Sequence, residues 1–460
     1  MSDPIAALRE LLSESRVLEQ ADDLEHYGRD WTRQFPPAPR AVVLPETVEE
    51  VQALVRWACA HSIALVPSGG RTGLSGGAVA MHGEVVLCME RMHRILDFDP
   101  VDRVLHVEAG VVTEALQQAA REHGLYYPVD FGSRGSSQIG GNIATNAGGI
   151  KVLRYGMTRD WVASLKVVTG NGDLLELNRD LVKNATGYDL RHLMIGSEGT
   201  LGVVVEAGIR LTEPPPELRV MLLAVPDMDA LMRVFGVLRA RLALTAFEFF
   251  TEQAMGHVLA QGGQRPFEGE APFYVLAEFE APDERAQEAA LAAFETAADE
   301  AWVVDGVISQ SQAQARQLWH LREGITESIA PHTPYKNDIS VRVSRVAPFM
   351  ADMQSLFDRE YPDFEVVWFG HIGDGNLHIG VLRPEDMAMD SFTEACGRVT
   401  GLLCDVLEKH GGSISAEHGV GLLKKPYLDR VRSPHEIALM RQVKAVFDPH
   451  GILNPGKVFD

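Results

Sequence analysis

Hydrophobic and polar positions along the chain follow two periods, which together predict a protein of mixed helices and strands. Between residues 41 and 67, the apolar runs AVVLP and IALVP flank TVEEVQALVRWACAHS, whose apolar residues recur every three or four positions. This pattern predicts a strand, a helix that Thr47 opens, and a second strand. The second half repeats the alternation, and we predict strands at 218–225, 243–250, 272–280 and 301–309 and helices at 227–241 and 282–300.

Three consecutive prolines in TEPPPELR, residues 212–219, separate these two regions. Proline cannot donate to a strand ladder and stiffens the chain, so the run is typical of a linker.

The sequence FGHIGDGNLHIG, residues 369–380, predicts a hairpin between strands at 364–369 and 377–381. Asp374-Gly375 is a strong signal for a two-residue turn, because both residues tolerate positive φ. That turn would place His371 directly opposite His378 on one face, with Cβ atoms about 5 Å apart, a spacing that suits two imidazoles on one metal ion. A longer loop would break this register, and two hydrogen-bonded histidines on a half-exposed sheet are the alternative.

Composition narrows the class of protein. A chain of 460 residues suffices for two or three domains. Its formal charge of −22 and pI near 5.2 argue against nucleic acid and anionic membranes as partners, although solubility alone also explains the charge.

We expect neither a secretory signal peptide nor a membrane span. Residues 1–20 contain no apolar core of a signal peptide, and no apolar stretch approaches the length of a membrane span. The four cysteines form no CxxC pair, so we expect reduced thiols in a cytoplasmic protein: Cys59, Cys88, Cys396 and Cys404.

Glycine-dense loops at 68–77, 132–149 and 196–202 suggest a polyphosphate ligand. The first follows an apolar strand, and its glycines leave backbone N–H groups open to an anion such as a pyrophosphate. It is neither a Walker loop nor a GxGxxG fingerprint, and tight turns alone are the alternative.

The first two loops, together with KNATGYDLRHLMIGSEGTLGVV (183–204) and NPGK (454–457), resemble the flavoproteins of the vanillyl-alcohol oxidase type from about residue 36 to the end. The resemblance implies an α+β fold in which a two-subdomain FAD-binding domain (1–215) precedes an α+β substrate or cap domain with an antiparallel sheet and the metal site (216–420). A C-terminal helical segment (421–460) would return to the flavin.

In that family the first loop cradles the pyrophosphate, the second runs along the ribityl chain and isoalloxazine, and the NPGK segment lies near the flavin. Some members attach FAD to a histidine of the first loop; this chain has Gly69, Gly70 and Arg71 there, which implies non-covalent FAD. The implied cofactor-binding residues are Ser68, Gly69, Gly70, Arg71, Thr72, Gly73, Leu74, Ser75, Gly76, Asp130, Gly132, Ser136, Gly140, Gly141, Asn142, Thr145, Asn146, Gly148, Gly149, Gly199, Gly202, Val203 and Asn454.

GHIGDGNLH and SAEHGVG resemble the FAD-linked D-2-hydroxyacid dehydrogenases, which include D-lactate and D-2-hydroxyglutarate dehydrogenases. In the metal-dependent members, the resemblance makes His371, His378 and Glu417 the ligands of a divalent ion, and two histidines with one carboxylate are a recurring zinc set.

The chemistry expected is transfer of a hydride from the substrate Cα to flavin N5, which yields the 2-oxoacid. His418 is the candidate base for the hydroxyl proton, because imidazole titrates near neutrality, and a role in orienting a ligand is its alternative. Asn376 is a candidate for holding the substrate carboxylate, or it serves the turn.

Arg322, Thr326 and Lys336 resemble the residues that grip the distal carboxylate in the D-2-hydroxyglutarate enzymes. Residues 317–330 read as one helix with an apolar stripe, and Arg322 and Thr326 share a face at its border. We therefore expect D-2-hydroxyglutarate as the substrate, with D-lactate as the runner-up. An internal ion pair is the alternative for Arg322, and Arg342 stands where relatives usually carry proline.

Two other classes stay open: a zinc hydrolase without flavin, and a non-catalytic flavin-binding module. The former leaves the glycine loops unexplained, and the latter leaves Arg322 and His418 unexplained. The sequence does not identify the electron acceptor; an electron-transfer flavoprotein and a quinone are the candidates, and a homodimer is the candidate assembly.

Overall fold

A computed structural model describes residues 4–460, which divide into two compact units. The first unit holds the residues up to Gly148, Gly156–Pro214 and Glu417–Asp460. The second holds Gly149–Tyr155 and Pro215–Ala416. The C-terminal residues therefore belong to the first unit. This segment begins at Glu417, four residues before the expected boundary at 421.

The first unit contains two sheets. Its helices and strands are α1 (Pro4–Leu12), η1 (Glu14–Arg16), β1 (Val17–Leu18), α2 (Ala21–Gly28), β2 (Ala41–Val43), α3 (Val48–His61), β3 (Leu65–Ser68), β4 (Val85–Cys88), η2 (Met89–Arg91), β5 (Ile95–Asp99), β6 (Val104–Glu108), α4 (Thr113–Glu122), α5 (Ile139–Thr145), α7 (Thr158–Trp161), β7 (Val162–Val168), β8 (Leu174–Leu177), α8 (Arg191–Met194), β9 (Val203–Arg210), η5 (Lys425–Arg430) and α16 (Pro434–Phe447).

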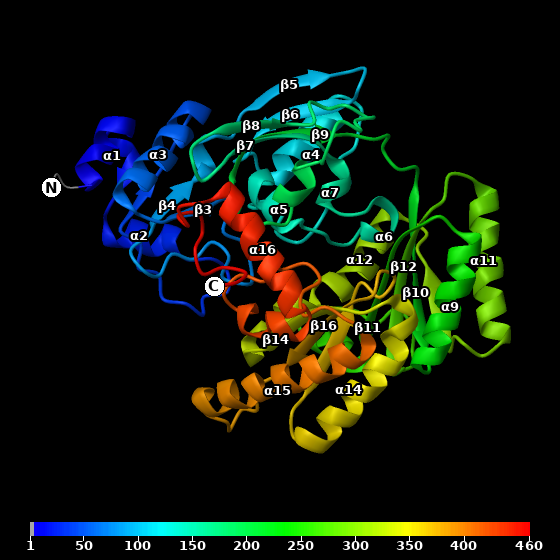
Figure 1. The fold of residues 1–460 in the computed structure, drawn as a ribbon. Coiled ribbons are helices and arrows are strands. Elements are labelled where there is room, and N and C mark those ends of the chain that lie inside the picture. Colours follow the sequence, from blue (N-terminus) through cyan, green and yellow to red (C-terminus); the bar gives the residue numbers. More distant parts are fainter. Residues whose placement is uncertain (1–3) are drawn as a thin grey trace. The chain divides into compact units, whose positions relative to one another are not determined.

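The small sheet has the order β1-β2-β4-β3, with β2, β4 and β3 parallel (Figure 1). The predicted strand, helix and strand of residues 41–67 are confirmed as β2, α3 and β3, and the Thr47 side chain caps α3 by accepting from the Glu50 N–H. The larger sheet is antiparallel in the order β5-β6-β9-β7-β8, and one continuous apolar core lies beneath both sheets.

The second unit is built on one antiparallel sheet of seven strands. Its helices and strands are α6 (Val152–Tyr155), β10 (Leu218–Val225), α9 (Met228–Arg241), β11 (Leu244–Thr251), α10 (Glu252–Ala260), β12 (Phe273–Glu280), α11 (Glu284–Asp299), β13 (Asp305–Ile308), α12 (Gln312–Glu323), α13 (Ile325–Ser328), η3 (Ala330–His332), β14 (Tyr335–Ser340), η4 (Val343–Arg345), α14 (Val346–Glu360), β15 (Val366–Gly370), β16 (Asn376–Val381) and α15 (Met389–His410).

The sheet order is β13-β10-β12-β11-β15-β16-β14, and α9 and α11 lie side by side in this unit (Figure 1). On one face, an apolar core joins α10, α12 and α13 to residues of β10, β11, β12 and β15. The predicted α+β class and antiparallel sheet are confirmed, and five of the six strands predicted for this unit begin within two residues of their predicted positions, whereas β13 begins at Asp305 and not at 301.

The helix predicted over 317–330 differs from the structure. Its apolar stripe is confirmed, because Leu318, Leu321, Ile325 and Ile329 are all buried. The helix is interrupted at Gly324, however, so α12 ends at Glu323 and a short α13 follows. No helix among residues 4–460 is both long and apolar enough to cross a bilayer.

Candidate active site

The first two glycine loops, 68–77 and 132–149, contact each other through their backbones. A Cβ on Gly70 would come within 2.0 Å of the Ser136 carbonyl oxygen, so only glycine permits this approach of the two backbones. The C-terminal segment connects the first glycine loop to the third through Asn454, whose Nδ2 donates to the carbonyls of Gly77 and Glu198 at 2.9 and 2.8 Å.

Buried polar atoms without a hydrogen-bond partner gather at these loops. Among the described residues, Ser68 Oγ, Gln138 Oε1 and Asn454 Oδ1 are of this kind. Buried polar groups are nearly always satisfied, so unpaired donors and acceptors beside two open glycine loops fit a large polar ligand such as FAD.

Some of the residues implied for cofactor binding also have contacts within the first unit. The Arg71 guanidinium donates to Gly69 O at 3.1 Å and stacks over Tyr27, with 4.6 Å from its carbon to the ring centre. Asn142 donates to Thr113 Oγ1 at 2.7 Å, and Asp130 pairs with Arg134 at 2.9 Å. The charge of Arg71 is therefore directed toward α2.

Lys457 is a buried cation that the sequence prediction did not include. Its side chain is 3% exposed, and among the described residues no carboxylate lies within ion-pair distance of its ammonium group. Burial lowers the pKa of Lys457 to about 8, although the charges of Glu84 and Asp30 partly oppose this. Asp30 in turn accepts from the Gly76 N–H at 2.8 Å, so Lys457 interacts electrostatically with a carboxylate that is bonded to the first glycine loop.

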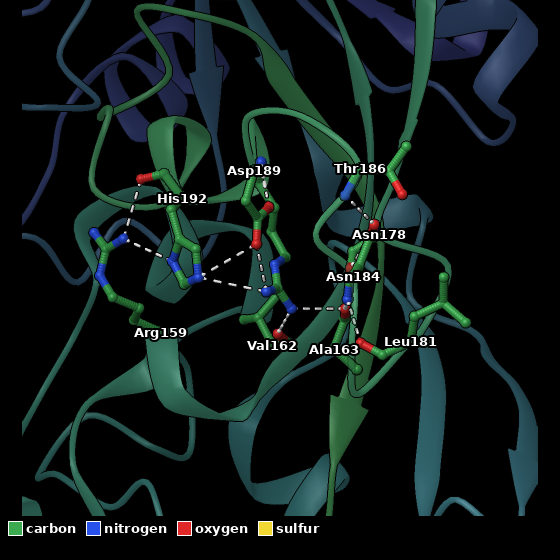
Figure 2. A network of polar contacts seen from close by, with 10 residues as sticks. Arg159, Val162, Ala163, Asn178, Leu181, Asn184, Thr186, Asp189 and His192 are labelled. Carbon is green, nitrogen blue, oxygen red and sulfur yellow. Dashed lines mark hydrogen bonds and ion pairs between the residues drawn. The ribbon is translucent and has the colours of Figure 1, made fainter.

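A polar network holds the segment that follows β8 (Figure 2). Arg191 donates to the carbonyls of Val162 and Ala163 at 2.6 and 2.7 Å, and Asn178 donates to Ala163 O at 2.8 Å. Figure 2 shows His192 facing Arg159, whose backbone N–H donates to Asn146 of the second glycine loop. The motif KNATGYDL thus begins a segment that is fastened to the second glycine loop.

The predicted register of the histidine hairpin is wrong by two residues. Phe369 pairs with His378, so His371 lies across from Asn376 and the loop has four residues, 372–375. The loop bonds to neighbouring strands: Gly373 N–H donates to Phe247 O, and Gly375 O accepts from Val341 N–H. These contacts favour the longer loop over a closed two-residue turn.

The two histidines still meet. A shift of two residues preserves the alternation of side chains, so both rings stay on one face of the sheet. Their centres lie 5.4 Å apart at an interplanar angle of 83°. The structure therefore brings His371 and His378 together as diagonal neighbours.

Glu248 on β11 contacts both His371 and Arg322. His371 Nδ1 lies 2.8 Å from both carboxylate oxygens of Glu248, and Arg322 Nη2 lies 2.9 Å from Oε2. The guanidinium also stacks over Phe369, 5.0 Å from the ring centre. The internal ion pair considered for Arg322 is thus present, although its Nε is buried without a hydrogen-bond partner among the described residues.

Asp338 on β14 organises the other side of the hairpin. It pairs with His378 in the sheet register, and its Oδ1 lies 3.7 Å from His378 Nδ1. Asn376 Nδ2 donates to Asp338 Oδ1 at 2.8 Å and to Ile339 O at 2.9 Å, while Asn376 Oδ1 is buried without a hydrogen-bond partner in the described chain. Neither Asp338 nor Glu248 was predicted as a site residue. For Glu248 the sequence did offer a signal, because it is the single carboxylate inside the apolar strand ALTAFEFF.

The remaining substrate candidates are more exposed. Thr326 and Lys336 are exposed and Arg322 is buried, so the expected common face of Arg322 and Thr326 is not seen in their burial. Although the Lys336 residue as a whole is exposed, its ammonium group is partly buried, and this burial lowers the pKa of Lys336. Arg342 is exposed.

Glu417 and His418 begin the C-terminal part of the first unit. Just before them, Ala416 N–H donates to Asp338 Oδ2 at 3.2 Å in the second unit. Just after them, the first unit holds the backbone: Ser75 Oγ donates to His418 O at 2.5 Å, and Glu198 accepts from the N–H groups of Val420 and Gly421. The chain is therefore anchored on both sides of this dipeptide.

Two family models match the chain. The model described as FAD binding domain matches residues 39–178, and the model described as FAD linked oxidases, C-terminal domain, matches residues 214–458.

Relatives match along nearly the whole chain. A protein of Xanthomonas citri pv. viticola named D-2-hydroxyglutarate dehydrogenase is 62% identical, over 100% of this chain and 98% of the relative. A protein of Schizosaccharomyces pombe, provisionally named a mitochondrial D-lactate dehydrogenase, is 35% identical over 95% of this chain and 84% of the relative.

Among solved structures, the 4-ethylphenol oxidase of Gulosibacter chungangensis in complex with isoeugenol has a TM-score of 0.78, with 19% identity over 99% of this chain and 96% of that chain. At this identity the likeness shows the fold alone.

Proposed function

Since the chain belongs to the FAD-linked D-2-hydroxyacid dehydrogenases of the vanillyl-alcohol oxidase superfamily, we propose that it oxidises D-2-hydroxyglutarate to 2-oxoglutarate with FAD and a divalent metal, zinc. The observation that carries the proposal is the buried polar face of the second unit. There, two imidazoles 5.4 Å apart share one side of a sheet with a buried arginine.

FAD is the oxidant. When bound, it would accept the hydride of the substrate Cα at N5, which is chemistry of the cofactor itself. The chain contributes the glycine loops, Asn454 and the buried cation Lys457. Gly69, Gly70 and Arg71 offer no attachment point, so the flavin is held without a covalent bond.

The metal ligands in this proposal are His371, His378 and Glu417, each of which offers one ligand atom. Two imidazoles and a carboxylate form a zinc set that leaves a position for substrate, and zinc there would acidify the α-hydroxyl. Support for Glu417 comes from the chain itself. Ala416 is bonded to Asp338, the register partner of His378, and Glu417 is the next residue.

His418 removes the hydroxyl proton in this scheme, and its imidazole is the base that accepts it. Its place in the chain supports the role, because it follows a metal ligand directly and its backbone is anchored at Ser75. Asn376 Oδ1 is buried and unpaired in the described chain, so this residue retains capacity for a substrate group, although its amide nitrogen already serves Asp338 and Ile339.

The distal carboxylate of a five-carbon substrate would be received by Arg322, Thr326 and Lys336. Glu248 neutralises part of the Arg322 charge, but the unpaired Nε–H leaves an edge of the guanidinium for an anion. D-lactate is the alternative: it lacks a second carboxylate, and one relative carries that enzyme name.

Anaerobic mixing of FAD-loaded, zinc-loaded protein with single D-2-hydroxyacids tests the proposal. D-2-hydroxyglutarate should bleach the flavin absorbance fastest, D-lactate much more slowly, and the L enantiomers not at all. Faster bleaching by D-lactate would show that D-lactate is the better substrate. No bleaching by any D-2-hydroxyacid would refute the proposed function.

Reduced flavin needs an oxidant, and an electron-transfer flavoprotein or a quinone is the proposed acceptor. A homodimer is the proposed assembly.

A further inference from the structure

We propose that Glu248 is a positioning residue that orients the metal ligand His371 and the substrate-binding Arg322 together, an inference that rests on the proposed function. The side chain of Glu248 is 1% exposed, and it lies in an otherwise apolar stretch of β11.

The sheet register places Glu248 against His371. Phe250 of β11 pairs with Phe369 of β15. Two residues farther along each strand, on the same face, stand Glu248 and His371. The contact therefore follows from strand pairing, which fixes both backbones.

The contact selects one tautomer of His371. A carboxylate only accepts hydrogen bonds, so the 2.8 Å contact of Nδ1 with Oε1 keeps a proton on Nδ1. Nε2 is then the ring nitrogen without a proton, and its lone pair is the one that would bind a metal ion. A carboxylate behind a ligating histidine fixes the ring orientation and makes the ligand more basic.

The same carboxylate also contacts Arg322, through Oε2, which lies within 2.8 Å of His371 Nδ1 as well. The ion pair of 2.9 Å takes the Nη2 corner of the guanidinium, and the ring of Phe369 supports its plane at 5.0 Å. The ion pair at Nη2 and the stacking on Phe369 together restrict the orientation of the guanidinium edge that carries Nε. The carboxylate thus relates the positions of two groups that act on opposite ends of one substrate.

Glu278 offers a matched control. It is a carboxylate of similar burial on the adjacent strand β12, and its register, with Ala246 opposite Glu278 and Glu248 opposite Leu276, puts it on the same face as Glu248. Its partners are Lys151, Thr245 and Trp319, and in the part of the chain that the structure describes it contacts neither histidine nor Arg322.

The experiment compares Glu248→Gln with Glu278→Gln in FAD-loaded protein, with zinc affinity measured by competition with a chromogenic chelator and melting temperature measured in parallel. Glu248→Gln should raise the zinc Kd about 10–100-fold, the usual effect of losing such a supporting carboxylate. Glu278→Gln should lower the melting temperature and leave the zinc Kd within twofold of wild type.

Equal zinc affinity of Glu248→Gln and wild type would overturn the inference, as would an equal loss in both variants, which would indicate a general effect of a buried charge. If Glu248→Gln does not fold, Glu248→Asp replaces it, because it keeps the charge but withdraws it by one methylene. It should weaken zinc binding, and unchanged affinity would overturn the inference. A wild-type protein that binds no zinc would instead refute the metal part of the proposed function.

Discussion

At the scale of single residues, the proposed site and its surroundings contain several buried charges. Glu248, Arg322, Glu198 and Lys457 are all less than one-tenth exposed. An unpaired buried charge is costly, so each such group needs a partner or a ligand. Arg322 and Glu248 have each other, and Glu198 accepts two backbone N–H groups. Lys457, by contrast, is a buried cation for which the described structure supplies no ion-pair partner.

Arg322→Lys tests the distal carboxylate. Lysine keeps the charge and a counterion for Glu248 but loses the planar fork, so the fold should persist. The variant should lose about 10–100-fold in kcat/KM for D-2-hydroxyglutarate, the value of one charge-assisted hydrogen bond. Steady-state kinetics with D-2-hydroxybutyrate is the control, and equal losses on both substrates would show that Arg322 does not serve a second carboxylate.

His418→Ala should slow flavin reduction by roughly 10²–10⁴-fold, the contribution expected of a positioned general base. The fold should survive, because Ser75 and Glu198 hold the backbone of this segment and not the imidazole. Rapid mixing with substrate measures the rate, and an unchanged flavin spectrum before mixing is the control. Reduction at the wild-type rate would exclude His418 as the base.

Lys457→Met should raise the Kd of FAD about 10–100-fold, if the ammonium forms a charge-assisted contact with an anionic group of the cofactor. Titration of apoprotein with FAD, followed by flavin fluorescence, measures this.

The effect should depend on pH. Because burial lowers the pKa of Lys457 to about 8, wild-type FAD affinity should fall as pH rises through that value. Without FAD the sign reverses for folding: a lysine with a depressed pKa makes the apoprotein more stable as pH rises from about 8 toward the ordinary 10.5. Equal pH profiles of wild type and variant would contradict both expectations.

At the scale of elements, strand pairing decides which side chains meet. Glu248 and His371 are 123 positions apart, and the pairing of β11 with β15 joins them. The hairpin loop has four residues because Phe247 and Val341 of neighbouring segments bond to it. The pairing of strands thus sets the register, and the register determines which side chains meet in the site.

The larger sheet of the first unit contains a histidine, His106, whose contacts with two aspartates depend on pH. His106 on β6 contacts Asp180 at 2.8 Å and Asp97 on β5 at 3.0 Å. Burial alone would lower the pKa of His106, but the hydrogen bonds and charges of these two aspartates outweigh it and raise the pKa.

A raised folded-state pKa makes these contacts stabilising below the ordinary pKa of histidine, 6.5, and the stabilisation is lost as pH rises through the folded value. His106→Gln should therefore lower the free energy of unfolding more at pH 5.5 than at pH 8, as measured by urea denaturation. An equal loss at the two pH values would show that His106 is neutral in the folded protein.

At the scale of the whole molecule, the cofactor loops and two of the three proposed metal ligands belong to different units. The glycine loops as far as Gly148, Asn454 and the ligand Glu417 lie in the first unit, and His371 and His378 lie in the second. Because none of the three ligands belongs to a glycine loop, loss of the metal should leave FAD binding intact.

Removal of zinc by a chelator, or His371→Ala, should abolish metal binding and most turnover while the absorbance spectrum of bound FAD stays nearly unchanged. Metal analysis and the flavin spectrum of one sample give both readouts. Full activity of protein shown to be metal-free would mean that the ion has no catalytic part, and loss of FAD on chelation would contradict the separation of the two sites.

Much of the local structure was predictable because its causes are local. Thr47 caps the helix after it, and the strands around residues 218–225 and 272–280 follow from their apolar runs. The two histidines share a face because side chains alternate along strands, and this survived an error in the register. The family resemblance, carried by short motifs, indicated the two glycine loops and the candidate ligands.

The sequence by itself determined the α+β class, the places of the strands and glycine loops, and the pairing of two imidazoles on one face. Only the tertiary structure decided what surrounds them: the four-residue loop, the carboxylates of Glu248 and Asp338 behind the histidines, and the buried Lys457. The reason is that turn chemistry and side-chain alternation act between near neighbours, whereas these contacts join residues far apart along the chain, and their partners depend on strand pairing that no local pattern encodes.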